Sequence, residues 1–370
     1  MTFRAPIIMI VTATIAVVAG TQQTPARADT SINADGSVSV RDAVLPQSTL
    51  LSKGGQLVLG RSRPSEGPGA PVPTPTDIQD MAELRRVYNE NLKPNVDHMR
   101  ATFPVDIEET TIDGISVAII TPRGGVPARN RNRLILNGPG GGFRTAVRGN
   151  GLLISIPVAA VVGVKVVSIL YRQGPEFQFP AASDDLLKVW NHFTRTYKPQ
   201  NIGMVGCSAG GSLVSQTTAM LITQRKPGPG ALGIYCSGLG SASGGDSQFF
   251  STLAVTNVPA AATQAAAAAI ASTPTRTYYT GVDMNQPVVN PTLDGALLVK
   301  FPPTLFFTAT RDFAMSAAAY SHAQLLSHAV ESQLLVFDGL YHGFMTNPDF
   351  PEAQQGYRIA AAFFDRHLGR

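Results

Sequence analysis

The sequence has little charge, few aromatic side chains and only two cysteines. Charged residues make up 15% of the 370 residues and aromatic residues 7%, whereas 44% are hydrophobic. This composition excludes an intrinsically disordered chain, because such chains combine low hydrophobicity with high net charge. Lysine and arginine form no cluster with interleaved aromatic residues, so the sequence gives no sign of nucleic-acid binding. It predicts a globular protein with a large buried core.

The first 28 residues have the pattern of a secretory signal. Arg4 precedes an apolar run from Ala5 to Gly20, and a polar stretch then ends in Ala26-Arg27-Ala28. The run of about 16 residues is shorter than the roughly 20 that a membrane-spanning helix needs, so cleavage is favoured over a retained anchor. We therefore expect an exported protein, periplasmic or secreted, with no stable membrane anchor after cleavage.

The composition along the sequence divides the chain into three predicted parts. After the signal at 1–28, residues 29–76 lack a sustained apolar period and end in a stretch rich in proline and glycine. This pattern predicts a loosely ordered segment followed by a linker. Residues 77–370 form the predicted main domain, whose first helix begins near a capping box at Thr76 and Gln79.

Short apolar strands alternate with longer helical stretches through the main domain. A hairpin with its turn at Asp113-Gly114 is predicted first. Six further strands are predicted at 133–136, 165–171, 201–205, 231–236, 303–308 and 333–337, and helices at 149–162, 182–197, 208–224, 313–329 and 352–368. This order predicts an α/β fold with a mostly parallel, doubly wound sheet and helices on both faces. The interval 237–300, with an alanine-rich segment at 259–271, is too long for a simple loop.

The chemistry concentrates at Gly206-Cys207-Ser208-Ala209-Gly210. This G-x-S-x-G motif follows a predicted strand and opens a predicted helix, which is the context that gives the motif its meaning. Glycines are needed there because larger side chains would collide at a sharp strand-to-helix turn. Ser208 is therefore the predicted nucleophile, although a chance match in a glycine-rich chain remains the alternative.

A serine hydroxyl needs a base, and the chain has six histidines. His342 follows a predicted strand by a short loop, which places it at the carboxyl edge of the sheet. Of the other histidines, four lie on predicted helices and His98 precedes the first predicted strands. The acid should lie between serine and histidine and past a strand end. Asp312 meets both conditions, and its competitors are Asp283, Asp294 and Asp338.

A glycine-rich run, Asn137-Gly-Pro-Gly-Gly-Gly-Phe143, follows another predicted strand. It lacks the G-K-[ST] of a phosphate-binding P-loop. Backbone NH groups exposed by consecutive glycines suit an oxyanion hole, which the NH of Ala209 would complete.

Several segments together carry a resemblance to a known family. Pro139 to Phe143 resembles H-G-G-G-F, and Gly206 to Gly211 resembles G-D-S-A-G-G. Tyr171 to Asp185 is similar to Y-R-L-A-P-E-x-x-F-P-A-A-x-D-D, and the segments that lead to Asp312 and follow His342 match those of the acid and the base. These are the motifs of the hormone-sensitive-lipase-like carboxylesterases, of the bacterial family IV and arylacetamide-deacetylase type.

The resemblance implies an α/β-hydrolase fold and hydrolysis of short- to medium-chain carboxylic esters through an acyl-enzyme on Ser208. It implies a small-molecule ester as the partner and no metal or organic cofactor. It also implies a helical cap, here from 77–100 and 237–300. Alignment on Phe143 carries the oxyanion donors over to Gly141 and Gly142, beside Ala209.

The sequence departs from the family at two positions. The histidine of the oxyanion motif is replaced by Pro139, or by Asn137 if the intervening Gly-Pro is an insertion. Cys207 replaces the usual acidic residue beside the serine. The same serine machinery also serves amide, lactone and transfer chemistry, so these remain alternatives, as does a non-catalytic binder of the same fold.

Cys207 and Cys236 are predicted to lie on neighbouring strands. The spacing of about 4.8 Å between strands would bring their Cα atoms near the distance that a disulfide needs. Free buried cysteines are also common, so the sequence leaves the bridge open.

Overall fold

The computed structural model describes residues 29–34, 38–41, 45–61, 78–240, 244–249 and 277–369. The predicted signal at 1–28 lies outside these residues. The chain divides into two units, Met1–Pro46 and Gln47–Arg370. In the first, β1 (Asp29–Ile32) and β2 (Val38–Arg41) pair antiparallel. Among the described residues, no helix has the length and apolar character needed to cross a membrane.

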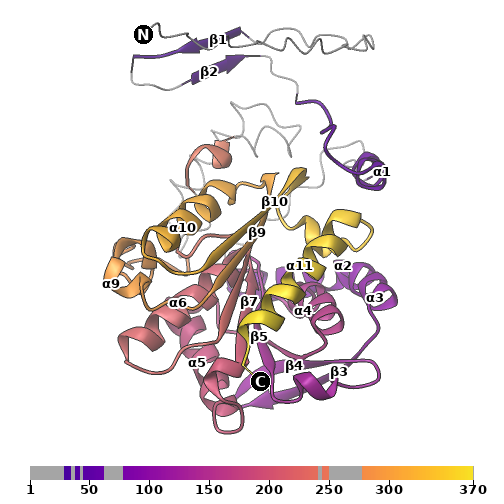
Figure 1. The fold of residues 1–370 in the computed structure, drawn as a ribbon, viewed down its shortest axis with the longest axis vertical. Helices are drawn as coiled ribbons and strands as arrows, with labels where there is room; N and C mark the ends of the chain where they lie inside the picture. The colour runs from indigo at the N-terminus through magenta and orange to yellow at the C-terminus, as the bar shows by residue number, and fades with distance from the viewer. Residues whose placement is uncertain are drawn as a thin grey trace, which may run out of the picture. The chain divides into compact units, whose positions relative to one another are not determined.

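The second unit is built on an eight-stranded sheet in the order β10-β9-β8-β7-β5-β6-β4-β3 (Figure 1). The strands are β3 (Val105–Ile112), β4 (Ile115–Pro122), β5 (Leu134–Gly138), β6 (Lys165–Ile169), β7 (Ile202–Cys207), β8 (Ala231–Tyr235), β9 (Thr304–Arg311) and β10 (Ser332–Tyr341). Pairing is antiparallel for β3 with β4 and for β4 with β6, and parallel elsewhere. The predicted mostly parallel sheet is confirmed.

The β3–β4 turn forms where the sequence predicts it. Asp113 and Gly114 have φ angles of 47° and 81°. Two-residue hairpin turns favour positive φ at both positions because this backbone follows the twist of the strands, and aspartate and glycine tolerate it.

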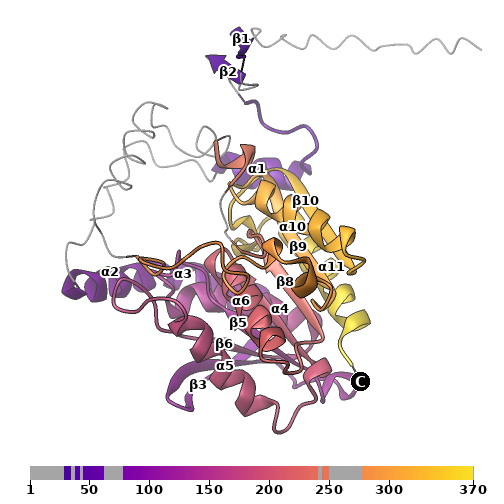
Figure 2. The ribbon, with the colours of Figure 1, turned by 90° about the vertical axis from the view of Figure 1, so that its left-hand side faces the viewer.

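Helices cover both faces of the sheet (Figures 1 and 2). α3 (Lys93–Thr102), α4 (Arg148–Val162) and α11 (Pro351–His367) share one hydrophobic core with the sheet. α5 (Ala181–Phe193), α6 (Ala209–Thr223), α9 (Gly295–Leu298) and α10 (Met315–Ser327) share the other. Along β5, Leu134 and Leu136 belong to the second core and Ile135 to the first, because successive side chains of a strand point to opposite faces.

The structure corrects the predicted start of the main domain. The sequence predicts a loosely ordered segment and a linker over 29–76, but α1 (Lys53–Arg61) is a helix of the second unit. Before it, Leu51 is buried and the backbone NH of Ser52 donates to Glu352 Oε1 at 2.8 Å. These partners lie far along the chain, so no local pattern predicts the docking.

The predicted cap segments are described in part. The first contains α2 (Ile78–Asn91), as predicted, and then α3, which the sequence analysis did not predict. In the second, the described residues form a 3-10 helix (Pro291–Leu293) and α9, whereas the alanine-rich segment at 259–271 lies outside the described residues.

Candidate active site

Ser208 occupies the sharp turn between β7 and α6. Its φ of 57° and ψ of −126° are unusual for a residue with a side chain, and its backbone NH donates to Tyr235 O at 2.8 Å. A Cβ atom on Gly206 would overlap the carbonyl of Gly210, and one on Gly210 would overlap the carbonyl of Gly138. The two glycines therefore let α6 begin directly against β7 and β5, with the partly exposed Ser208 at the turn.

The three predicted triad residues follow strands that end at one edge of the sheet. Ser208 follows β7, Asp312 follows β9 and His342 follows β10. The strands β7, β8, β9 and β10 are consecutive and parallel, so their carboxyl ends meet at the same edge. The imidazole Nδ1 of His342 lies 2.7 Å from Asp312 Oδ1.

Asp312 is fully buried and surrounded by donors. Oδ1 also accepts from the backbone NH of Ala314 at 2.9 Å, and Oδ2 accepts from Thr308 Oγ1 at 2.7 Å. Burial alone would raise the pKa of this carboxyl group. The hydrogen bond and charge of His342 outweigh burial, with help from Ala314 and the Cys236 thiol, and lower the pKa of Asp312. The carboxylate is therefore ionised at neutral pH.

His342 is held between this carboxylate and an aromatic ring. The ring of Phe313 stacks on the imidazole with centroids 4.1 Å apart. Burial lowers the pKa of His342, but the hydrogen bond and charge of Asp312 outweigh it and raise the pKa above its ordinary value. Because a carboxylate can only accept, neutral His342 carries its proton on Nδ1 and keeps the lone pair on Nε2. That tautomer is the one a general base needs.

The competing acids have other partners. Asp338 accepts a hydrogen bond from Ser48 Oγ. Asp294 caps α9 through the NH groups at its start, and Asp283 accepts from the NH of Asn285 at 2.9 Å. Within the described chain, Asp312 is therefore the one of the four that contacts His342.

The remaining histidines also lie apart from this group. Each contacts a partner outside the group: His98 with Asp349, His192 with Asp113, His322 with Ser332, His328 with Gln324 and His367 with Glu331.

The glycine-rich loop packs directly on the serine turn. A Cβ on Gly140 would lie 2.7 Å from Cys207 O and 3.4 Å from Ser208 Cβ. In the described part of the chain, the backbone NH groups of Gly141, Gly142 and Ala209 have no hydrogen-bond acceptor. Unpaired NH groups beside a nucleophile are what an oxyanion hole requires.

The structure distinguishes the two positions proposed for the missing motif histidine. Asn137 is a buried residue of β5, and its Nδ2 donates to Gly151 O at 3.0 Å and Ser155 Oγ at 2.8 Å in α4. Pro139 follows the strand, and its carbonyl accepts from Tyr171 Oη at 2.7 Å. Of the two positions, Pro139 is therefore the one at the start of the glycine-rich loop, where the motif histidine would stand.

Two side chains that the sequence analysis did not assign hold this loop. Gln173 accepts from the NH of Ala146 at 2.7 Å and donates to its carbonyl at 3.0 Å. Arg85, from α2, donates to Arg144 O at 2.8 Å and forms an ion pair with Glu176. The motif from Tyr171 to Asp185 contains Gln173 and Glu176 and could have indicated them, whereas no pattern marks Arg85.

Cys207 and Cys236 are buried free thiols, so the bridge that the sequence left open is not formed. Their strands are neighbours, as expected, but Cys207 pairs with Tyr235, and Cys236 lies one residue beyond.

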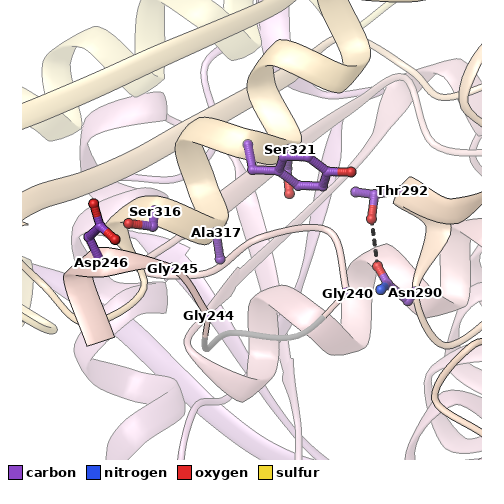
Figure 3. A pocket seen from close by; sticks show the side chains of 10 residues that line it. Gly240, Gly244, Gly245, Asp246, Asn290, Thr292, Ser316, Ala317 and Ser321 are labelled. Carbon is purple, nitrogen blue, oxygen red and sulfur yellow. Dashed lines mark hydrogen bonds between the residues drawn. The ribbon is translucent and has the colours of Figure 1, made fainter. Parts of the chain in front are cut away.

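A cavity of about 490 Å³ lies beside α10 (Figure 3). Its walls come from residues after β8, from the 3-10 helix region and from α10: Gly240, Gly244, Gly245, Asp246, Asn290, Thr292, Ser316, Ala317, Tyr320 and Ser321. None of the triad residues lines it. Ser247 joins this region to the site, because its Oγ donates to Phe313 O at 2.8 Å.

Comparison with known families identifies the class of this protein. A family model described as alpha/beta hydrolase fold matches residues 140–346, more than half of the chain, so the chain belongs to this family. The predicted fold class is confirmed.

Relatives and solved structures add detail. The chain is similar to an ethyl acetate hydrolase of Pseudomonas putida, with 30% identity over 33% of this chain and 40% of the relative. The matches to curated relatives span from 21% to 40% of those proteins' lengths.

Two esterase structures cover most of the chain. The structure of an esterase E25 matches with 27% identity and a TM-score of 0.70, covering 88% of this chain and 98% of that one. An esterase from the bacterial hormone-sensitive lipase family matches with 20% identity and a TM-score of 0.66, covering 88% and 100%. The predicted resemblance to hormone-sensitive-lipase-like esterases is confirmed.

Proposed function

We propose that this protein is a serine carboxylesterase in which Ser208 is the nucleophile, His342 the general base and Asp312 the orienting acid. The observation that carries the proposal is the His342–Asp312 hydrogen bond at the sheet edge where the Ser208 turn also lies. Family membership and the likeness to esterases support the same reaction.

The first half of the reaction forms an acyl-enzyme. His342 Nε2 accepts the hydroxyl proton of Ser208 while Oγ attacks the ester carbonyl carbon. The carbonyl oxygen becomes an oxyanion and accepts hydrogen bonds from the NH groups of Gly141, Gly142 and Ala209. His342 then donates its proton to the leaving alcohol as the ester bond breaks. Asp312 stabilises the imidazolium throughout.

The second half releases the acid. His342 accepts a proton from water, whose oxygen attacks the acyl carbon and forms a second oxyanion at the same NH groups. The proton returns to Ser208 Oγ when the acyl–oxygen bond breaks. The serine and the base are then restored.

The substrates proposed are esters of short to medium acyl chains. The support is the resemblance to the family and the name of the ethyl acetate hydrolase relative. The cap segments at 77–100 and 237–300 are proposed to select among such esters.

A series of p-nitrophenyl esters from acetate to palmitate tests the proposal, with a p-nitroanilide and a lactone alongside. Short and medium esters should be hydrolysed fastest, and Ser208→Ala, as matched control, should remove the activity. Preferred cleavage of the anilide or lactone would favour another acyl bond. If purified protein with intact Ser208 turned over none of these compounds, a non-catalytic binder would replace the esterase.

Export is a separate part of the proposal. Its support is the apolar run from Ala5 to Gly20 and the A-x-A site that ends at Ala28. N-terminal sequencing of protein from the periplasm or medium of producing cells should begin at Asp29. Full-length protein retained in the cytosol would contradict export and leave the esterase proposal intact.

A further inference from the structure

The metal-binding atoms of three side chains meet at the proposed base, and Cys207 ends a neighbouring strand. The Sγ of Cys236, a carboxylate oxygen of Asp312 and a ring nitrogen of His342 all lie within 4.8 Å of one another. Cys207 ends β7, which lies beside β8, and Cys236 follows β8, so the two thiols come from adjacent positions at the sheet edge. The chain has only two cysteines, Cys207 and Cys236.

The spacing suits a tetrahedral metal ion. With metal–sulfur bonds of about 2.3 Å and metal–nitrogen bonds of about 2.0 Å, the ligands of zinc lie roughly 3.3 to 3.8 Å apart. The ligand atoms of Cys236, Asp312 and His342 already lie within 4.8 Å of one another and need move only a short distance, and the Cys207 thiol would turn toward them as the fourth ligand. Two thiolates, an imidazole and a carboxylate form a donor set that zinc and other thiophilic divalent ions prefer.

The residues around the cluster stabilise a metal-bound thiolate and leave the cluster accessible to an ion. The backbone NH of Gly343 donates to Cys236 Sγ at 3.2 Å, and such NH groups stabilise sulfur ligands of metals. Cys236 and Asp312 are fully buried, but the His342 side chain is 27% exposed and Cys207 is 7% exposed. An ion can therefore reach the cluster past the imidazole.

We propose that Cys207, Cys236, Asp312 and His342 form an inhibitory site for a thiophilic divalent cation such as Zn²⁺ or Cd²⁺. As an account of inhibition, this inference depends on the proposed esterase function. The ion would bind both Sγ atoms, a carboxylate oxygen of Asp312 and Nδ1 of His342.

Inhibition follows from the proton balance. The two thiols lose their protons to solvent when the metal–sulfur bonds form. Nδ1 can bind the metal only without its proton, so neutral His342 carries its proton on Nε2 instead. Nε2 then has no lone pair to accept the proton of Ser208, and the carboxylate of Asp312 is withdrawn from the base. The ion thus removes general-base catalysis while the substrate site stays in place.

Cadmium titration of the reduced full-length protein tests the site without relying on activity. Thiolate-to-cadmium charge transfer absorbs in the ultraviolet, and the band reports only on Cys207 and Cys236 because the chain has no other cysteine. The expected result is a band that saturates at one ion per chain. Hydrolysis of p-nitrophenyl acetate should fall with the same midpoint, and EDTA should restore it.

Variants locate the ion. Cys207→Ser and Cys236→Ser should each weaken cadmium binding by more than about 100-fold, since loss of a ligand exceeds the effect of losing an outer-shell partner. Inhibition of each variant is measured against its own metal-free activity. His98→Gln is the matched control, because it removes an exposed imidazole beside Asp349 that could bind metal adventitiously. It should leave the band and the midpoint unchanged.

The possible outcomes of these experiments distinguish the proposed metal site from the proposed esterase function. No band at saturating cadmium, or inhibition that persists in both serine variants, would overturn the metal site while the esterase proposal stands. Thiols that resist alkylation in denatured, unreduced protein would overturn it too, because a disulfide cannot supply two thiolates. A saturable band in protein that hydrolyses no ester even without metal would support cation binding at the site and remove the proposed function.

Discussion

Replacement of Asp312 by asparagine tests the assigned acid most directly. The Oδ1 atom of Asp312 accepts from both His342 Nδ1 and the backbone NH of Ala314, whereas Oδ2 faces the hydroxyl of Thr308. An asparagine must place its oxygen on one side and its NH₂ group on the other. The hydroxyl can rotate and accept from the NH₂ group, but a backbone NH cannot.

The structure therefore predicts which way the asparagine points. If the NH₂ group faced Ala314, this buried NH would lose its acceptor, which costs about 1–3 kcal/mol, or a factor of about 5 to 150 in population. The favoured orientation keeps the oxygen toward His342 and preserves the tautomer. What is lost is the negative charge that stabilises the imidazolium. We expect kcat/KM to fall by about 10²- to 10³-fold, within the usual range of general-base effects and less than the roughly 10⁴-fold loss that a wrong tautomer causes.

The pH profile provides a second measure. The pKa of His342 is raised by Asp312 and lowered by burial, so removing the charge leaves burial dominant and lowers the pKa. Because the base works only when neutral, the acid limb of kcat/KM should move to lower pH in Asp312→Asn. Asp338→Asn is the matched control, since that carboxylate contacts Ser48 instead. Unchanged turnover in Asp312→Asn, or an acid limb that stays in place, would refute the assignment.

Two further predictions concern the supports of the site. Gln173→Ala should lower both the melting temperature and kcat, because it leaves the NH of Ala146 without its acceptor at a cost of about 1–3 kcal/mol. Gln173→Glu keeps an acceptor for that NH and should restore part of the stability. Thermal unfolding and kinetics on the same samples measure both, and an alanine variant with native kcat would contradict the role of Gln173 in holding the glycine-rich loop. Gly210→Ala should destabilise the fold by about 3 kcal/mol or more, because the new Cβ would overlap the carbonyl of Gly138. Gly228→Ala is the control: its Cβ would lie in open space, so stability should change by less than about 0.5 kcal/mol. Equal urea midpoints for the two alanine variants would contradict the close packing of α6 on β5.

The sequence by itself predicted the alternation of strands and helices from β3 onward and pointed to Ser208 as the proposed nucleophile. These features have local signals: the turn at Asp113-Gly114, short apolar strands, and glycines on both sides of Ser208. A local signal predicts well where the backbone conformation depends on the residues at the turn itself, as at the positive φ angles of Asp113 and Ser208. The order of Ser208, Asp312 and His342 past strand ends also follows from the chain alone.

Only the tertiary structure decided which side chains meet. The sequence offered four aspartates as candidates for the acid. Which of them contacts His342 became clear only from the parallel pairing of β9 with β10. The docking of Ser52 on Glu352 and the contact of Cys236 with Asp312 likewise join residues far apart in the chain. Such contacts depend on strand order and on the exact depth of each side chain at the sheet edge. No repeating pattern in the sequence encodes the strand order or the depth of a side chain, because both depend on packing between elements that are distant in the chain.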